Sequence, residues 1–157
     1  MFAALMRGES AIRPVFPDLA KPAVAAVAAF DASRWFTKLQ LAGVDRVSQL
    51  AVAAADLAVK DAGGHEGIDP SRLGVYVGCG MGGTASLDAA YHAAFQKGGR
   101  VPPLTIPALM ANAPAAHVAI RQGAQGPVLT YSVACASSAV ALSEAAKSLA
   151  CGDVDMA

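Results

Sequence analysis

The chain has 157 residues, a length that predicts one domain or part of a larger one. Hydrophobic residues make up 55% and charged residues 15%, with a mean hydropathy of +0.44, so the chain can bury a sizeable core and has little polar surface. Twelve Lys and Arg balance twelve Asp and Glu, which argues against the basic surface of a nucleic-acid-binding or membrane-surface protein.

The apolar runs are too short to cross a membrane. The longest ones, residues 50–59 and 134–142, fall below the roughly 18 to 20 apolar residues that span a bilayer. Residues 1–13 lack the pattern of a secretory signal, so we expect a cytoplasmic protein. The cysteines are Cys79, Cys135 and Cys151. Their odd number and the lack of a CxxC pair argue against a disulfide framework and against a zinc knuckle.

The N-terminal quarter is irregular and is followed by one long helix. Three prolines interrupt residues 1–43, which we expect to form a loop with at most short helices, including the end of a helix at Phe2–Met6. The prolines are Pro14, Pro17 and Pro22. Apolar residues then recur at helical spacing from Asp45, which can cap the helix, to the glycine pair at Gly63.

Two short apolar segments, residues 73–78 and 127–133, have the composition of buried strands. Helices are expected over residues 84–96 and over residues 135–152. A further helix is expected to begin after Asn112, which would be its N-cap, with Pro114 in the first turn. Residues 98–111, which contain three prolines, are predicted to be a loop, and residues 152–157 resemble a turn that leads into another strand. Strands that alternate with helices predict an α/β layered fold with a mixed or parallel sheet.

A glycine-rich turn follows the first predicted strand. Gly78, Gly80 and Gly83 satisfy G-x-G-x-x-G between a strand and a helix, the context of a dinucleotide site. The acidic residue that binds the ribose, at the end of a second strand about 20 residues further on, is missing. A tight turn with close backbone packing is therefore favoured, with Cys79 buried inside it. An NAD(P)-binding dehydrogenase that uses residues 78–83 stays open as an alternative.

Cys135 lies where the second predicted strand runs directly into a helix. A thiol at such a junction is displayed on a sharp turn at the positive end of the helix dipole, close to backbone N–H groups that can bind an oxyanion. This is how nucleophile elbows are built. Free cysteine is also among the most buried residue types, so spacing alone leaves a nucleophile and an ordinary core residue as alternatives.

The residues around Cys135 carry a family resemblance. The string VACASSAVAL resembles the active-site region of the β-ketoacyl synthases, the condensing enzymes of fatty-acid and polyketide assembly. RLGVYVGCGMGG resembles the strand and glycine turn of that family, and IPALMANAPAAHVAIRQGAQGP resembles the helix that precedes its active-site strand. FDASRWF and DRVSQLAVAAADLAVKDAG resemble its N-terminal portion, so the resemblance extends from Phe2 to Ala157.

The resemblance implies an α/β thiolase-like layered fold, in which a mixed sheet is flanked by helices. Residues 1–157 would form a partial N-terminal β-ketoacyl synthase domain, truncated at both ends, without the family's first strand and C-terminal half. Cys135 would accept an acyl group from acyl carrier protein as a thioester, with its backbone N–H in the oxyanion hole. Decarboxylative condensation with a malonyl-carrier thioester would then give a 3-oxoacyl product, which makes the full-length protein an acyltransferase.

The resemblance also implies partners and a substrate pocket. Met110 matches a position that lines the acyl pocket, and the strand Val128–Val133 matches one that pairs across a homodimer. The partners implied are acyl carrier protein and a second copy of the chain, with no nucleic acid, membrane, cofactor or metal.

The family's two catalytic histidines have no counterpart here. His65 and His92 are expected to be solvated, and His117 to be structural. We therefore expect residues 1–157 alone to be inactive, and a non-catalytic partner subunit stays open as a further alternative.

Overall fold

The structure, a computed structural model, describes residues 2–16, 19–21, 23–27 and 29–157. Contacts divide the chain into two compact units, Met1–Asp31 and Ala32–Ala157. Each unit is described by itself.

The first unit contains a β-hairpin that the sequence did not predict. Helix α1 (Phe2–Met6) confirms the expected helix end. Strands β1 (Ile12–Val15) and β2 (Ala23–Ala26) pair antiparallel, with Ile12 opposite Ala26. The expectation of a loop with at most short helices is wrong here, because Pro14 is tolerated in a strand at the edge of a sheet and the alanines of β2 pair despite their low strand propensity. Pro17 and Pro22 lie outside the described residues.

The second unit opens with a 3₁₀ turn (Ala32–Arg34), the short helix α2 (Lys38–Leu41) and the long helix α3 (Arg46–Asp61). The predicted cap of α3 is confirmed, since the Asp45 side chain accepts a hydrogen bond of 3.0 Å from the N–H of Val47. The chain leaves the helix through Gly63, whose φ of 89° lies in the left-handed region that glycine adopts without strain.

A parallel pair of strands forms the centre of the second unit. Strand β3 (Val75–Gly78) pairs with β4 (Val128–Tyr131), with Val75 opposite Val128 and Gly78 opposite Tyr131. Both predicted strands are therefore present. Leu73 and Met156 form a further parallel bridge, in which the N–H of Gly74 donates to the carbonyl of Met156 at 2.9 Å. The turn after Gly152 thus leads back to the sheet, as the sequence predicted.

The remaining helices connect and cover these strands. They are α4 (Thr84–Tyr91), which continues in a π-helical turn (His92–Gln96), α5 (Thr105–Leu109), α6 (Ala113–Gln122) and α7 (Ser137–Ala150). The prediction of a loop over residues 98–111 is wrong at α5. Pro107 is the third residue of that helix, where the backbone N–H needs no partner. Asn112 is the N-cap of α6, as predicted, although its side chain makes no capping bond.

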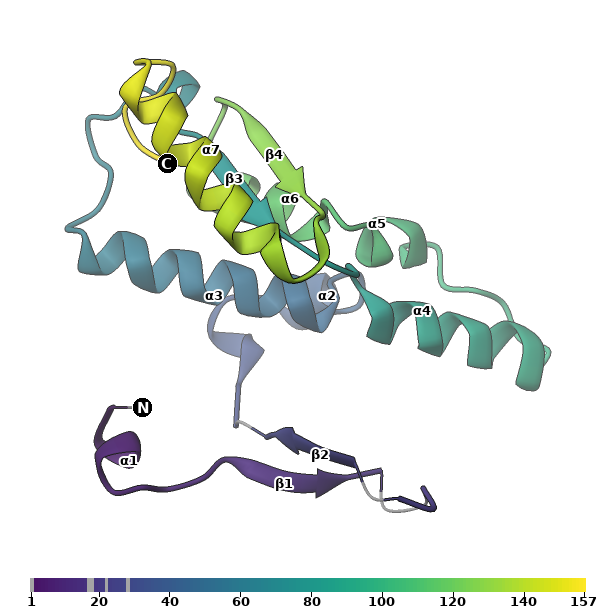
Figure 1. The fold of residues 1–157 in the computed structure, drawn as a ribbon. Helices are drawn as coiled ribbons and strands as arrows, with labels where there is room; N and C mark the ends of the chain where they lie inside the picture. The colour runs from purple at the N-terminus through teal and green to yellow at the C-terminus, as the bar shows by residue number, and fades with distance from the viewer. Residues whose placement is uncertain (1, 17–18, 22, 28) are drawn as a thin grey trace. The chain divides into compact units, whose positions relative to one another are not determined.

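The helices of this unit form layers around the strands. Helix α7 lies on one face of the β3–β4 pair and α6 packs on the other, with α3 beside α6 (Figure 1). The core comes from these contacts: Val52, Ala53, Leu73, Val75, Ala115, Val118, Ala141 and Val154 are buried. An ion pair of 2.8 Å between Arg121 and Asp56 joins α6 to α3. This is the predicted arrangement of a sheet flanked by helices.

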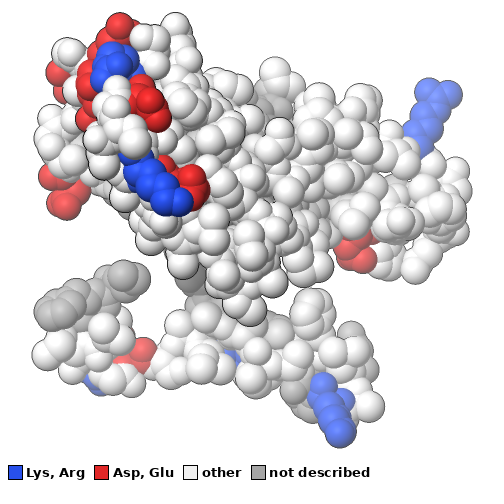
Figure 2. All heavy atoms as spheres, turned by 45° about the horizontal axis from the view of Figure 1, so that its top comes forward, with Lys and Arg blue, Asp and Glu red and all other residues white. Residues whose placement is uncertain are grey.

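Charged side chains are sparse on the visible surface of this unit. Figure 2 shows them concentrated at the end that carries the C-terminal part of α7. The ion pairs Arg72–Asp155 and Lys147–Glu144 lie there. In the part of the chain that the structure describes, no helix combines the length and apolar character needed to cross a membrane.

Candidate active site

Cys135 sits on a tight connection between β4 and α7. After Tyr131 the chain leaves the strand, forms a 3₁₀ turn (Ala134–Ala136) and enters α7 at Ser137. Ala134 has a φ of 46°, a left-handed conformation that a residue with a β-carbon rarely adopts. Such strain persists only where the surroundings enforce it, and it is concentrated at functional sites. The predicted strand-to-helix junction is therefore present, and it is sharper than the sequence indicated.

Ser137 fixes the shape of this connection. Its side chain is buried and its Oγ accepts a hydrogen bond of 2.8 Å from the N–H of Val133. The same hydroxyl donates to the carbonyl of Ala134 at 2.7 Å. One side chain thus bonds both to the strained residue Ala134 and to the residue before it, and Cys135 lies inside this bracket. We call residues 133–137 the elbow.

The thiol of Cys135 is exposed, whereas Cys79 is buried. Cys135 lies two residues before the first residue of α7, a helix of 14 residues, at the end where the helix dipole is positive and the first N–H groups lack helical partners. Backbone N–H groups in such a position can stabilise an oxyanion that develops beside the thiol. Cys151 is also exposed but caps the opposite, C-terminal end of α7.

The glycine turn, residues 78–83, packs tightly against its surroundings. A β-carbon on Gly78 would lie well under 3.0 Å from the backbone of Ser137 and Ser138, so glycine allows β3 to meet the start of α7. A β-carbon on Gly83 would lie 2.9 Å from the α-carbon of Leu109. Cys79 is buried, with 6% of its surface exposed. The close packing favoured by the sequence is therefore confirmed.

Hydrogen bonds link the glycine turn to the residue before Met110 and to the residues that precede Cys135. The N–H of Gly83 donates to the carbonyl of Leu109, next to Met110, at 3.0 Å. The N–H of Cys79 donates to Tyr131 at 3.0 Å, and the hydroxyl of Ser132 donates to the carbonyl of Gly80 at 3.3 Å. The start of α4, helix α5 and the start of α7 meet where β3 and β4 end (Figure 1). Met110 itself is 43% exposed and ends α5.

The three histidines lie outside the elbow. His65 is half-buried, and its Nε2 lies 3.2 Å from Oε1 of Gln122, so the prediction of a solvated side chain is wrong for it. His92 is exposed, as predicted, and its Nε2 lies 3.9 Å from Asp88. His117 is half-buried in α6, and burial lowers its pKa from the ordinary value. Its placement agrees with a structural role.

A contact across 57 residues of sequence explains the position of His65. Gln122 donates through Nε2 to Asp56 at 2.7 Å, so its carbonyl oxygen faces His65. Arg121 donates to the same carboxylate and lowers the pKa of Asp56.

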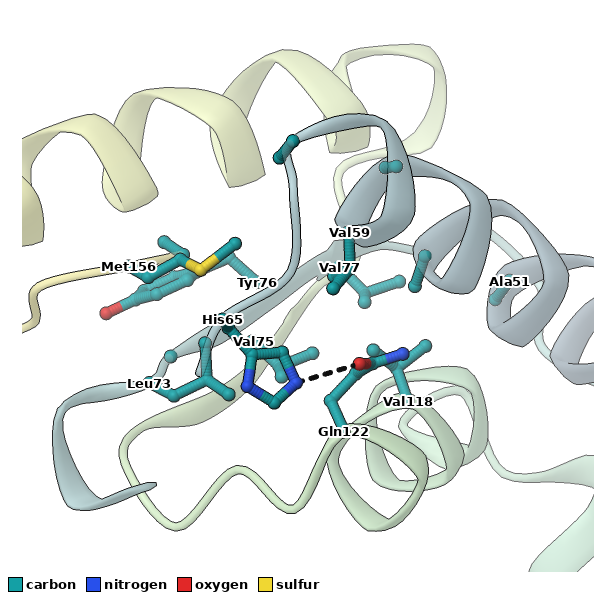
Figure 3. A pocket seen from close by; sticks show the side chains of 15 residues that line it. Ala51, Val59, His65, Leu73, Val75, Tyr76, Val77, Val118, Gln122 and Met156 are labelled. Atoms are coloured by element: carbon teal, nitrogen blue, oxygen red, sulfur yellow. Dashed lines mark hydrogen bonds between the residues drawn. The ribbon is translucent and has the colours of Figure 1, made fainter. Parts of the chain in front are cut away.

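Two clefts lie on either side of β3, and neither contains Cys135 or Met110. The first, of about 380 Å³, is bounded by α3, β3 and α6, and Figure 3 shows the His65–Gln122 bond in it. The second, of about 410 Å³, lies between β3 and α7. Ala157 borders both clefts. Among the described residues no cluster of three or more His, Cys, Asp or Glu side chains could hold a metal ion.

Comparison with known proteins identifies the family. Residues 4–157 match the family described as "Beta-ketoacyl synthase, N-terminal domain", so the chain belongs to this family. It is 34% identical over 130 residues to "3-oxoacyl-[acyl-carrier-protein] synthase 2" of Rhizobium meliloti (strain 1021), covering 81% of this chain and 31% of that protein. It is 37% identical over 119 residues to "Nodulation protein E" of Rhizobium meliloti, covering 74% of this chain and 29% of that protein.

Solved structures agree on the fold. A β-ketoacyl synthase from Burkholderia phymatum STM815 superposes with a TM-score of 0.80 at 28% identity, over 98% of this chain and 40% of that one. The predicted thiolase-like fold is therefore confirmed. The chain spans about a third of the length of the curated relatives cited above.

Proposed function

We propose that this chain contributes the acyl-accepting part of the active site of a 3-oxoacyl-[acyl-carrier-protein] synthase, with Cys135 as the nucleophile. The observation that carries the proposal is the elbow, where an exposed thiol is held on a strained turn at the N-terminal end of α7. Membership of the β-ketoacyl synthase family supports it, as does the similarity to a protein named 3-oxoacyl-[acyl-carrier-protein] synthase 2.

The proposed chemistry has two covalent steps. In the first, the thiolate of Cys135 attacks the thioester carbonyl of an acyl-carrier protein, and the backbone N–H of Cys135 stabilises the oxyanion. The carrier leaves as a thiolate that takes a proton from water, and the acyl group stays on Sγ. In the second step, a malonyl-carrier thioester loses CO₂, and the resulting carbanion attacks the acyl carbonyl. The bond to Sγ then breaks, which restores the thiolate and gives a 3-oxoacyl-carrier thioester.

The histidines of the second step belong, in this proposal, to a part of the protein outside residues 1–157. His65 bonds to α6, His92 lies in the π-helical turn and His117 lies in α6. We therefore expect residues 1–157 alone to be inactive in condensation. Detectable decarboxylation of malonyl-carrier thioester by these residues alone would contradict this part of the proposal.

The nucleophile is tested by site-selective labelling of the protein encoded by the complete reading frame. An electrophilic acyl-thioester mimic is added, and the labelled peptides are identified by mass spectrometry. We expect label on Cys135, with Cys79 and Cys151 spared. Cys151→Ser is the matched control, because Cys151 is also exposed but lies at the opposite end of α7. Equal labelling of Cys135 and Cys151, or undiminished total labelling of Cys135→Ser, would contradict the assignment.

Acyl carrier protein is the proposed partner for delivery of both substrates, in fatty-acid or polyketide synthesis. The name of the relative from Rhizobium meliloti, 3-oxoacyl-[acyl-carrier-protein] synthase 2, supports this choice. Met110 is proposed to line the acyl pocket, because it ends the helix that the glycine turn links to the residues before Cys135. A Met110→Ala variant should accept longer acyl groups relative to short ones, and an unchanged chain-length profile would remove Met110 from the pocket.

The proposed homodimer forms through the strand segment Val128–Val133. In the described sheet, one edge of β4 pairs with β3 and the other edge pairs with no strand. Three apolar residues of the segment are partly exposed: Val128 (40%), Leu129 (44%) and Val133 (51%). An apolar strand edge of this kind is stabilised when a second strand covers it. Analytical ultracentrifugation should show a dimer that Val128→Lys converts to a monomer. Ile120→Lys, an exposed apolar position on α6, should leave the dimer intact.

A further inference from the structure

Asp45 links two helices through one buried carboxylate. The residue is 5% exposed. Its Oδ1 accepts the N–H of Val47 at 3.0 Å, which caps α3. Its Oδ2 accepts both the N–H and the hydroxyl of Ser86, at 2.8 and 2.7 Å. Ser86 belongs to the first turn of α4, 41 residues further along the chain, so the second pair of bonds is a tertiary contact.

Ser86 lies three residues beyond the glycine turn. The turn is therefore held at its C-terminal side by Asp45, through the start of α4. Its remaining bonds, described above, run to Leu109 beside Met110 and to Tyr131 and Ser132 before Cys135. Hydrogen bonds to a carboxylate are stronger than bonds between neutral groups, so the Asp45 contact is the strongest of these attachments.

The packing leaves the turn little freedom to move near Asp45. A β-carbon on Gly83 would lie 3.0 Å from the β-carbon of Asp45. A β-carbon on Gly82 would lie 2.6 Å from the carbonyl oxygen of Leu109. The backbones of the turn and of α5 are thus in direct contact beside the carboxylate.

We propose that Asp45 is a positioning residue: by holding Ser86 it fixes the glycine turn, and through the turn it sets the position of the Met110 segment relative to Cys135. This deepens the proposed synthase function and rests on it, because the effect on catalysis requires that an acyl group occupies the space between Met110 and Cys135. Asp45 touches no reacting atom in this proposal.

The substitution Asp45→Asn separates the two roles of the side chain. Asparagine caps helices as well as aspartate does, so α3 keeps its cap. Its single side-chain oxygen cannot also accept the two Ser86 bonds, and its amide group would face the Ser86 donors. A matched control is Asp69→Asn. Asp69 accepts the N–H and hydroxyl of Ser71 at 2.9 and 2.8 Å in the same way, but it is exposed and bonds within its own turn.

Cys79 provides a local readout that needs no catalysis. It lies inside the glycine turn and is buried, so a thiol reagent reaches it only when the turn opens. In the protein encoded by the complete reading frame, Asp45→Asn should raise the labelling rate of Cys79 by roughly ten- to a hundredfold, the factor that corresponds to loss of a hydrogen bond to a charged group. Alkylation of Cys135 should change less than about twofold, because Ser137 holds the elbow independently.

The kinetic readout is a split between KM and kcat. We expect Asp45→Asn to raise KM for the acyl-carrier substrate at least about fivefold with a smaller change in kcat, because binding geometry changes while the nucleophile does not. Asp69→Asn should leave both values and Cys79 labelling unchanged. Ser86→Ala, which removes only the hydroxyl donor, should give an intermediate effect and serves if Asp45→Asn does not fold.

The outcomes are distinguishable. If Asp45→Asn lowers thermal stability but leaves Cys79 labelling and KM unchanged, Asp45 is only structural and the inference is wrong. Equal effects from Asp69→Asn would also overturn it. If the unsubstituted protein transfers no acyl group, the proposed function is wrong. Cys79 labelling then still decides whether Asp45 holds the turn.

Discussion

Two alanine substitutions in the glycine turn test how β3 and α7 are packed. Neither Gly78 nor Gly80 has a positive φ, so the backbone itself accepts alanine at both positions. A β-carbon on Gly78 would lie 2.5 Å from the carbonyl oxygen of Ser137, whereas ordinary contact begins at 3.4 Å. A β-carbon on Gly80 would meet nothing within 4 Å. The two positions are two residues apart and differ chiefly in this contact.

The energetic cost follows from what must move. For Gly78→Ala, the start of α7 must retreat by about 0.9 Å, and the obstructing atoms are backbone atoms that cannot rotate away. Overpacking typically costs about 1 to 3 kcal/mol, and a clash with backbone belongs at the upper end, so we expect a loss of about 3 kcal/mol in the free energy of unfolding. Gly80→Ala should stay within about 0.5 kcal/mol, as surface substitutions usually do.

Urea unfolding followed by circular dichroism measures both variants. Gly78→Ala should lower the urea midpoint clearly at unchanged slope. It should also slow acylation of Cys135, because the elbow ends at Ser137, where α7 is displaced. If Gly78→Ala proves as stable and as reactive as Gly80→Ala, the claim that β3 lies in close contact with the elbow is wrong.

Three further predictions concern single side chains. Ser137→Ala should cost about 1 kcal/mol, as loss of an intramolecular hydrogen bond does, and slow acylation of Cys135, while Ser138→Ala should do neither in the same unfolding and labelling assays. Because burial lowers the pKa of His117, the unfolded chain binds more protons, and stability should fall as the pH drops below about 6.5. Urea midpoints at about pH 7.5 and about pH 5.5 should differ less for His117→Gln than for the unsubstituted protein; an equal difference would contradict this. The hydrogen bond from Arg121 lowers the pKa of Asp56, so this ion pair stabilises the folded state by about 0.5 kcal/mol after solvent screening. The stabilisation is present above about pH 3.8 and is lost as the pH falls through the lowered pKa of Asp56. Arg121→Ala should therefore move the acid-unfolding midpoint to higher pH, and an unmoved midpoint would refute this.

The parts of the fold with strong local signals were predictable from sequence. Helix α3 combines a capping aspartate, helical spacing of apolar residues and a glycine stop, and it forms as expected. The β1–β2 hairpin was not predicted because alanine and proline are poor strand residues, and the local composition gives no signal for the pairing of the two strands. Helix α5 was missed because Pro107 reads as a breaker unless the start of the helix is already known.

In the candidate site, too, some features were predictable from the sequence and others depend on the tertiary fold. The position of Cys135 between a strand and a helix follows from composition, and the family resemblance identifies its role. The left-handed conformation of Ala134 and the bracket made by Ser137 depend on how β4 meets α7, which no local pattern encodes. The Asp45–Ser86 contact and the burial of His65 against Gln122 join residues 41 and 57 positions apart. Only the tertiary fold reveals such pairs.

Transfer of an acyl group to Cys135 is the most direct test of the central claim. The protein encoded by the complete reading frame is incubated with an acyl-carrier protein that bears a radiolabelled acyl group, without malonyl-carrier thioester. We predict close to one acyl group per chain, released by hydroxylamine as a thioester should be, and located on the peptide that contains Cys135. Acylation of another residue, or full acylation of a Cys135→Ser variant, would contradict the account.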